Sequence, residues 1–198
     1  MINVLKKNWL VALLSIALLS SCGISRQKAQ IENLGKCKFD IQSVDSVRVA
    51  GTSIQKMIKG GGIDLSSLPS VALGMLRKNI PLDAVIRLKI ENPTLKKAAI
   101  NQFQYIVLFE KQQLAEGIVN QSVSLDPGQS TVASVRLNTN IYELINNGDL
   151  ASFIGSSSDT KKGLFTIKIK PSIQVGGKSI FYPGYITIDK EVSRKILL

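Results

Sequence analysis

The sequence predicts a mainly β protein built from antiparallel strands, with one or two added helices. Apolar and polar residues alternate over several short segments, most clearly over residues 84–91, which is typical of strands with one buried face. Turn residues separate these segments, as in Asp126-Pro127-Gly128. Helical spacing of apolar residues occurs in two places, so about eight strands and two helices are expected.

The first 21 residues have the parts of a secretory signal. Lys6 and Lys7 lie in a start without acidic residues, and residues 9–19 are apolar apart from Ser15. This apolar run is shorter than the ~20 residues that a membrane-spanning helix needs. A retained membrane anchor is the alternative, but the small residues that follow favour cleavage.

The end of this run, Leu19-Ser20-Ser21-Cys22, resembles the lipobox of bacterial lipoproteins. In that family the cysteine thiol receives a diacylglyceryl group, the signal is cut just before it, and the new amine is usually acylated. The resemblance implies that residues 1–21 are removed, that Leu19, Ser20 and Ser21 are read as the signal, and that Cys22 is the lipidated N-terminus. Two or three acyl chains hold a protein stably at a membrane, whereas one holds it marginally.

Residue 23 bears on the destination of such a lipoprotein. By analogy with Gram-negative sorting, an Asp there favours retention at the inner membrane, and this chain has Gly23. We therefore expect the periplasmic face of the outer membrane, with the periplasmic face of the inner membrane as the alternative.

Residues 22–35 are polar and predict a tether between the lipid and a domain over residues 36–198. In that domain Cys37, Phe39 and Ile41 alternate with polar residues and predict a first strand, whose face Val47 and Val49 continue.

The spacing of apolar residues changes from strand alternation to helical spacing and predicts a helix over residues 67–78. Apolar residues recur at helical spacing, Ser67 can cap the start, and Pro69 suits the first turn. Pro81 stops the helix. It is expected to be amphipathic and to pack on the sheet, with partner binding as the alternative.

The strand over residues 84–91 ends at Asn92-Pro93-Thr94, because proline cannot donate to a central ladder. Asn92 and Pro93 are read as a structural turn. Further strands are predicted at residues 103–109, 112–117, 123–125, 131–137, 165–169 and 179–188, the last broken at Pro183-Gly184.

A second helix is predicted near residues 141–154. Asn140 can cap it, and Glu143 follows three residues later, as in a capping box. Gly176-Gly177 predicts a hairpin turn between the last strands.

Length and charge suit one basic domain. Removing residues 1–21 leaves 198 − 21 = 177 residues, enough for a proper core. The net charge falls from +11 to +9, because Lys6 and Lys7 leave and no acidic residue does. A basic surface could face anionic lipid or glycan, but the scattered positions favour an ordinary solvated surface. Nucleic acid is not an expected partner in the envelope.

The residue types present limit the catalytic and metal-binding chemistry that the chain can perform. The chain has no histidine, which excludes Ser-His-Asp and Cys-His catalysis and histidine metal sites. With Cys22 lipidated, Cys37 has no partner for a disulfide within the chain and is expected to be a small buried apolar residue, with a reactive thiol as the alternative. Residues 176–179, GGKS, lack the earlier glycine of a phosphate loop, since Ser172 stands there.

Residues 85–137 resemble the late embryogenesis abundant (LEA) type 2 domain, also called the water-stress and hypersensitive-response (WHy) domain. The shared pattern is a strand ending in Asn92-Pro93, an aromatic strand over residues 103–109, the hairpin Leu114-Ala115-Glu116-Gly117, and a polar turn before another strand. The resemblance implies an immunoglobulin or fibronectin type III-like antiparallel β-sandwich without a known catalytic site. It also implies an association with stress tolerance.

Three functions are left open by the sequence. The first is a non-catalytic, membrane-anchored envelope lipoprotein with a structural, stress-related or partner-binding sandwich. The second is a module for glycan or anionic lipid, for which Tyr182 and Tyr185 could stack on sugar. The third is a hydrolase with a carboxylate pair, for which no motif exists. We expect no enzyme and no cofactor, and as partners the membrane, through the lipid, and an unidentified envelope protein or glycan.

Overall fold

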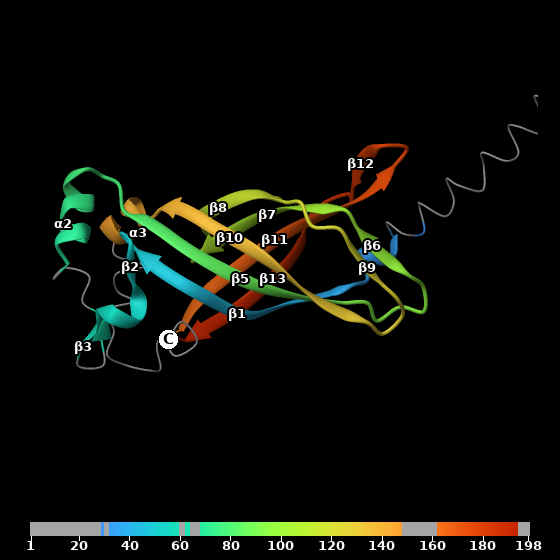
Figure 1. Cartoon of the computed structure of the whole chain (residues 1–198), viewed down its shortest axis with the longest axis horizontal. Helices are drawn as coiled ribbons and strands as arrows, with labels where there is room; N and C mark the ends of the chain where they lie inside the picture. Colours follow the sequence, from blue (N-terminus) through green and yellow to red (C-terminus); the bar gives the residue numbers. More distant parts are fainter. Residues whose placement is uncertain (1–28, 30–31, 60–61, 64–67, 148–161, 194–198) are drawn as a thin grey trace, which may run out of the picture.

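The computed structural model describes residues 29, 32–59, 62–63, 68–147 and 162–193. Its strands form two antiparallel sheets packed face to face, which confirms the predicted mainly β sandwich (Figure 1). The first sheet contains, in spatial order, β10 (Ser130–Asn140), β5 (Pro81–Glu91), β1 (Lys38–Val49) and β2 (Thr52–Ser53). The second contains β8 (Gln112–Val119), β7 (Gln102–Phe109) and β11 (Lys162–Val175), with β12 (Lys178–Phe181) and β13 (Ile186–Ser193) both paired to β11.

Short elements cover the two ends of the sandwich. One end carries η1 (Ile54–Met57), α2 (Pro69–Leu76), α3 (Tyr142–Asn146) and the ribbon of β3 (Ile58–Lys59) and β4 (Gly62–Ile63). The opposite end carries the ribbon of β6 (Ala98–Ile100) and β9 (Val123–Leu125). The hairpin of β11 and β12 projects from the sandwich at this same end (Figure 1).

The predicted strand faces are the faces that the structure buries. In β5, which pairs with β1 on one side and β10 on the other, Ala84, Ile86, Leu88 and Ile90 are all buried. In β7 every second residue from Phe103 to Phe109 is buried. Since side chains alternate across a strand, these two rows face each other and form the centre of the core.

The first strand keeps its apolar face through two irregularities. The register between β1 and β5 shifts between Ile41 and Ser43 and again between Asp45 and Arg48. Ser46 adopts a φ of 54°, a left-handed conformation that a β-bulge accommodates. Ile41, Val47 and Val49 nevertheless remain buried, as the sequence predicts.

The predicted hairpin turns form where expected. Gly176 and Gly177 have φ values of 54° and 79°, the pair of positive values that a tight two-residue hairpin requires. Glu110 and Lys111 adopt 47° and 71° between β7 and β8, although neither is glycine. Residues 176–179 are therefore a turn and the start of a strand, as predicted.

The first predicted helix forms, but the prediction that its apolar face packs on the sheet is wrong. Helix α2 starts at Pro69, after Leu68, whose side chain makes no cap hydrogen bond; Ser67 lies outside the described residues. Val71 and Gly74 are the buried residues of the helix, while Leu73 and Leu76 are 50% and 83% exposed. The helix sits beyond the end of the sandwich, so most of its apolar side chains find no sheet to cover (Figure 1).

The second helix is short where the structure describes it. Helix α3 ends at Asn146, and residues 148–161 lie outside the described residues. Its N-cap is Ile141 and not the predicted Asn140. The Asn140 Oδ1 accepts from the backbone N–H of Tyr142 at 3.0 Å and of Ile80 at 2.8 Å, which ties α3 to the chain after α2.

The end of the predicted tether is packed against the domain. Leu34 is fully buried and belongs to the core, and Asn33 is 7% exposed. A Cβ on Gly35 would lie 2.6 Å from the ring of Tyr182, so glycine permits this close approach. A single leucine in a polar stretch gives no periodic signal, which is why the sequence places Leu34 in the tether.

Candidate functional site

A narrow apolar cavity between the two sheets is the candidate functional site. Its volume is about 60 Å³. The first sheet, with η1 and Ile141, provides most of the wall, and the second sheet provides Leu114, Phe165 and Ile167. Ile54 and Ile141 place it toward the end that carries α3.

The described lining of this cavity consists of hydrocarbon side chains. The thirteen described residues that line it are all apolar, and they contribute no polar atom to its wall. A cavity of this kind stays dry, because a water molecule inside needs two to four polar partners. Ions and polar groups are excluded for the same reason. The cavity can therefore accept apolar groups but cannot by itself perform acid–base or nucleophilic chemistry.

Three of the lining residues are only half-buried and mark where the cavity approaches solvent. These are Val44 on β1, Leu82 on β5 and Phe165 on β11, whereas their neighbours in the wall are buried. Phe165 also packs on Phe109, with ring centroids 4.9 Å apart. Val44 and Phe165 come from opposite sheets, so this approach lies along a boundary between the sheets.

One boundary between the sheets runs between β1 and β13, and an ion pair crosses it. The Lys190 Nζ lies 3.0 Å from the Asp40 Oδ1. Lys190 is the register partner of Phe165, so the two side chains leave the sheet on the same face. Asp40 directly precedes Ile41, which lines the cavity, and its exposed side chain leaves β1 on the opposite face. The ion pair therefore joins the two sheets on the solvent side of this boundary.

Asn92 occupies a buried polar position at the opposite end of the sandwich. Its side chain is fully buried, and the Nδ2 group donates to the carbonyl oxygens of Lys96 and Leu125 at 2.9 and 3.0 Å. The Oδ1 accepts from the N–H and hydroxyl of Thr94 at 3.1 and 2.7 Å. Its backbone pairs with Gln129 and Gly128, both at 2.9 Å.

These bonds make Asn92 a connector between two loops. A buried carboxamide without partners would be costly, and here donor and acceptor are both satisfied. Since neither polar atom is left to reach a ligand, the geometry is that of a structural turn. The exposed Pro93 follows where β5 ends.

Cys37 is buried at 6% exposure, and its thiol donates to the Asn33 carbonyl oxygen at 3.6 Å. Burial raises the pKa of this thiol from 9.0 to about 11. A thiol that is neutral at physiological pH and shielded from solvent is a poor nucleophile. The structure agrees with a packing role for Cys37.

The described carboxylates lie at the surface and are paired with basic side chains in several places, including Asp45 with Arg87 at 3.0 Å and Glu191 with Lys162 at 2.8 Å. The hydrogen bonds from these partners lower the pKa of both carboxyls. A general acid of a hydrolase needs the opposite shift. Within the described residues, no group of three His, Cys, Asp or Glu could hold a metal ion.

The two tyrosines considered for sugar stacking differ in their surroundings. Tyr182 covers Gly35 and is half-buried. Tyr185 is 44% exposed, beside a shallow depression of about 370 Å³ that also contains Ile118, and the Lys170 Nζ lies 5.7 Å from its ring centroid. Only Tyr185 of this pair presents a largely open ring.

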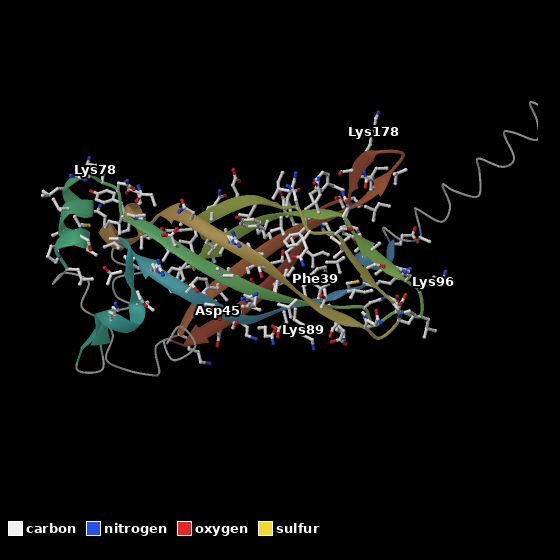
Figure 2. All side chains as sticks on the ribbon, viewed as in Figure 1. Phe39, Asp45, Lys78, Lys89, Lys96 and Lys178 are labelled. Atoms are coloured by element: carbon white, nitrogen blue, oxygen red, sulfur yellow. The ribbon has the colours of Figure 1, made fainter. Side chains whose placement is uncertain are left out.

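Basic side chains are spread over the molecule. Figure 2 shows Lys78 at the α2 end, Lys96 and Lys178 at the opposite end, and Lys89 between them. Among the residues that the structure describes, this distribution gives no single focused basic patch of the kind that concentrates a polyanion.

The structure does not bring the predicted site residues together. Leu19, Ser20, Ser21 and Cys22 lie outside the described residues. Asn92 and Pro93 lie at the end opposite the cavity. The cavity itself was missed, because apolar alternation predicts a filled core and gives no sign that strands from two sheets leave space between them.

No family model matches the chain, and no curated protein matches it. Among solved structures, a protein from Archaeoglobus fulgidus is 18% identical with a TM-score of 0.37, over 57% of this chain and 85% of that protein. A protein from Arabidopsis thaliana is 11% identical with a TM-score of 0.40, over 57% and 70% of the two chains. A candidate late embryogenesis abundant protein is 15% identical with a TM-score of 0.37, over 95% and 92%. At these levels the likenesses assign neither a site nor a ligand to this chain.

Proposed function

We propose that this chain is a non-catalytic lipoprotein of the bacterial envelope, whose β-sandwich is held at a membrane by lipid on Cys22. The observation that carries the proposal is Leu19-Ser20-Ser21-Cys22 directly after a basic and apolar start. The sandwich then has a structural or stress-related role, or contacts other envelope components. The periplasmic face of the outer membrane is its proposed location.

The state of the second cysteine supports this assignment. The chain has two cysteines, and Cys37 is buried with a raised pKa, so its thiol is poorly available for acylation. Among the described residues, no helix is long and apolar enough to cross a membrane. A lipid on Cys22 would provide the attachment instead.

Labelling with radioactive palmitate in the cell of origin tests the proposal. We expect label on the wild-type chain and on the Cys37→Ala variant, and none on Cys22→Ala. Cys37→Ala is the matched control because it removes the other thiol. Label that persists in Cys22→Ala, or an exported chain whose N-terminus is not an acylated Cys22 by mass spectrometry, would contradict the proposal.

A second candidate function is glycan binding at Tyr185. The observation that favours it is the exposed ring beside Ile118 in a shallow depression with Gln104 and Glu116 as polar neighbours. A glycan array with the wild-type chain and Tyr185→Ala tests it. Binding of an envelope glycan that Tyr185→Ala loses is the expected result, and no binding above background would remove this candidate.

A further inference from the structure

We infer that the end of the sandwich that carries β6, β9 and β12 rests on an anionic phospholipid surface, with the side chain of Leu95 inserted among the headgroups. The inference rests on the lipid anchor proposed above, because the anchor keeps that surface within reach. It adds a contact that the folded domain itself makes. We call Leu95, Lys96, Lys178, Ile180 and Lys36 the tether-end surface.

The described chain enters the domain at this end. Leu34 is fully buried in the core, and a Cβ on Gly35 would lie 2.6 Å from the ring of Tyr182, which directly follows β12. Helix α2 occupies the opposite end (Figure 1). A lipid on Cys22 therefore ties the domain to the membrane from the end that carries β6, β9 and β12.

The reach of the tether favours this end over the α2 end. Position 32 comes 10 residues after position 22, a distance of at most about 35 Å when the chain is fully extended. Strand β5, which runs between the two ends, has 11 residues and is about 37 Å long. Contact through α2 would require the tether to span the whole length of the domain, whereas contact at the tether-end surface leaves the tether slack.

Leu95 is the apolar tip of the tether-end surface. It is 94% exposed, more than any other large apolar side chain among the described residues. Exposure of this much apolar area to water is unfavourable, and transfer to the interface of a bilayer relieves it. Lys96 beside it suits the same position, because a lysine can bury its stem there and keep its charge among the headgroups.

The loop holds Leu95 in a projecting position. The Asn92 Nδ2 group donates to the Lys96 carbonyl oxygen at 2.9 Å, and the Lys96 N–H donates to the Thr94 hydroxyl oxygen at 3.3 Å. These bonds fix the backbone on both sides of Leu95, and they are held in turn by the burial of Asn92. A side chain on an ordered backbone loses less conformational entropy on insertion than one on a loose loop.

A second exposed loop lies beside the first at this end. The hairpin of β11 and β12 carries Ile180, which is 42% exposed. Asn101, which follows β6, donates from its side chain to the Ser179 hydroxyl oxygen at 3.4 Å and so places the hairpin next to β6. Figure 2 shows Lys178 and Lys96 at this end of the molecule. Each of the two loops therefore presents an apolar side chain together with a basic one.

The basic side chains of the tether-end surface are available to anionic headgroups. Lys36, Lys96 and Lys178 are exposed, and within the described residues none of them forms an ion pair. Each lysine near an anionic bilayer adds an attraction that falls off over about 10 Å. Glu32 lies at the same end and opposes them, so the attraction is modest and adds to the anchor without replacing it.

The test uses the full chain, acylated in the cell of origin and reconstituted in vesicles of phosphatidylethanolamine and phosphatidylglycerol. A polarity-sensitive fluorophore is attached at Leu95→Cys or at Leu76→Cys, both in the Cys37→Ala background. Leu76 is the matched control, because it is 83% exposed and lies on α2 at the opposite end. We expect a blue-shifted emission at residue 95 that nitroxide on the lipid acyl chains quenches, and an unshifted, unquenched emission at residue 76.

Substitutions away from the label separate the apolar and the basic contributions. With the fluorophore at Ile180→Cys, Leu95→Ser should lower the ratio of inserted to free label about tenfold, because the insertion of one leucine is lost. Leu76→Ser should leave this ratio unchanged. Lys96→Gln should lower the ratio about fivefold. Phosphatidylcholine in place of phosphatidylglycerol should lower it as well and remove the effect of Lys96→Gln.

The outcomes distinguish the contact from the anchor. Quenching at residue 76, with or without quenching at residue 95, would place α2 on the membrane and overturn the inference. Quenching at neither position, in a chain that mass spectrometry shows to be acylated at Cys22, would overturn the contact and leave the anchor intact. Equal effects of Leu95→Ser and Leu76→Ser would overturn the role of Leu95. A chain without acyl groups at Cys22 would overturn the anchor and this contact with it.

Discussion

The phenol of Tyr105 donates a hydrogen bond of 2.9 Å to the backbone carbonyl oxygen of Arg136. Tyr105 lies on β7 of the second sheet and Arg136 on β10, an edge strand of the first. The bond therefore joins the two layers at the boundary between β8 and β10. Thr139 reinforces this boundary by donating from its hydroxyl to the Leu114 carbonyl oxygen. Glycine at position 117 leaves room for the phenol, since a Cβ there would lie 2.8 Å from its oxygen.

Replacing Tyr105 with phenylalanine should lower the free energy of unfolding by about 1–3 kcal/mol, because the Arg136 carbonyl loses a partner inside the sandwich. Tyr185→Phe is the matched control, since that ring is 44% exposed, and should change stability by less than about 0.5 kcal/mol. Urea unfolding followed by circular dichroism measures both. Equal effects would mean that the bond between the sheets contributes nothing specific.

Changing Asn92 to aspartate should be more damaging than changing it to alanine. The Nδ2 group donates to carbonyl oxygens, and a carboxylate oxygen in its place would face them without a proton to share. We expect a loss of about 3–5 kcal/mol for Asn92→Asp, of the size seen when a buried charge lacks a partner, and about 1–3 kcal/mol for Asn92→Ala. Asn101→Asp, at a more exposed amide, serves as the control for the added charge and should stay near the wild type in the same urea experiment.

The Cys37 thiol should make the free energy of unfolding depend on pH in the alkaline range. Its thiol has a pKa of about 11 in the folded protein and of 9.0 when unperturbed. Because the folded pKa is the higher one, the unfolded chain loses its proton first as the pH rises. The contribution of the protonated thiol to the free energy of unfolding is complete below pH 9. As the pH rises toward 11, the free energy of unfolding falls by about 2 kcal/mol.

The comparison for this prediction is the pH profile of Cys37→Ala, which keeps every other titrating group. The difference between the two unfolding free energies should shrink between pH 9 and pH 11. A difference that stays constant over this range would show that the Cys37 thiol titrates alike in the folded and unfolded chains.

A larger side chain should be tolerated where it points into the inter-sheet cavity, and should destabilise the protein elsewhere in the core. Ala84 lines the cavity, so Ala84→Leu places methylenes in empty space and should keep or raise the melting temperature. Ala133 is fully buried on β10 outside the cavity, so Ala133→Leu should cost about 1–3 kcal/mol through overpacking. Thermal unfolding of the two variants side by side is the measurement. An equal loss in both would indicate that no usable space exists at Ala84.

Alternation determined much of this fold, because strand periodicity is a local property. The buried rows of β5 and β7 can be read directly from the spacing of their apolar residues, and the hairpin at Gly176-Gly177 from its two glycines. The signal-like start and the motif up to Cys22 that resembles a lipobox are likewise short-range patterns. They are visible without any knowledge of the rest of the chain, and they remain predictions about the N-terminus.

Tertiary structure decided what depends on residues far apart in the chain. The exposure of Leu76 follows from where α2 stands relative to the sheets, and the burial of Leu34 from the surface it meets, neither of which spacing encodes. The partners of Asn92 and the pairing of Lys190 with Asp40, 150 residues apart, arise only when the strands assemble. The same holds for the cavity, because empty space is a property of how two sheets fit and not of any one segment.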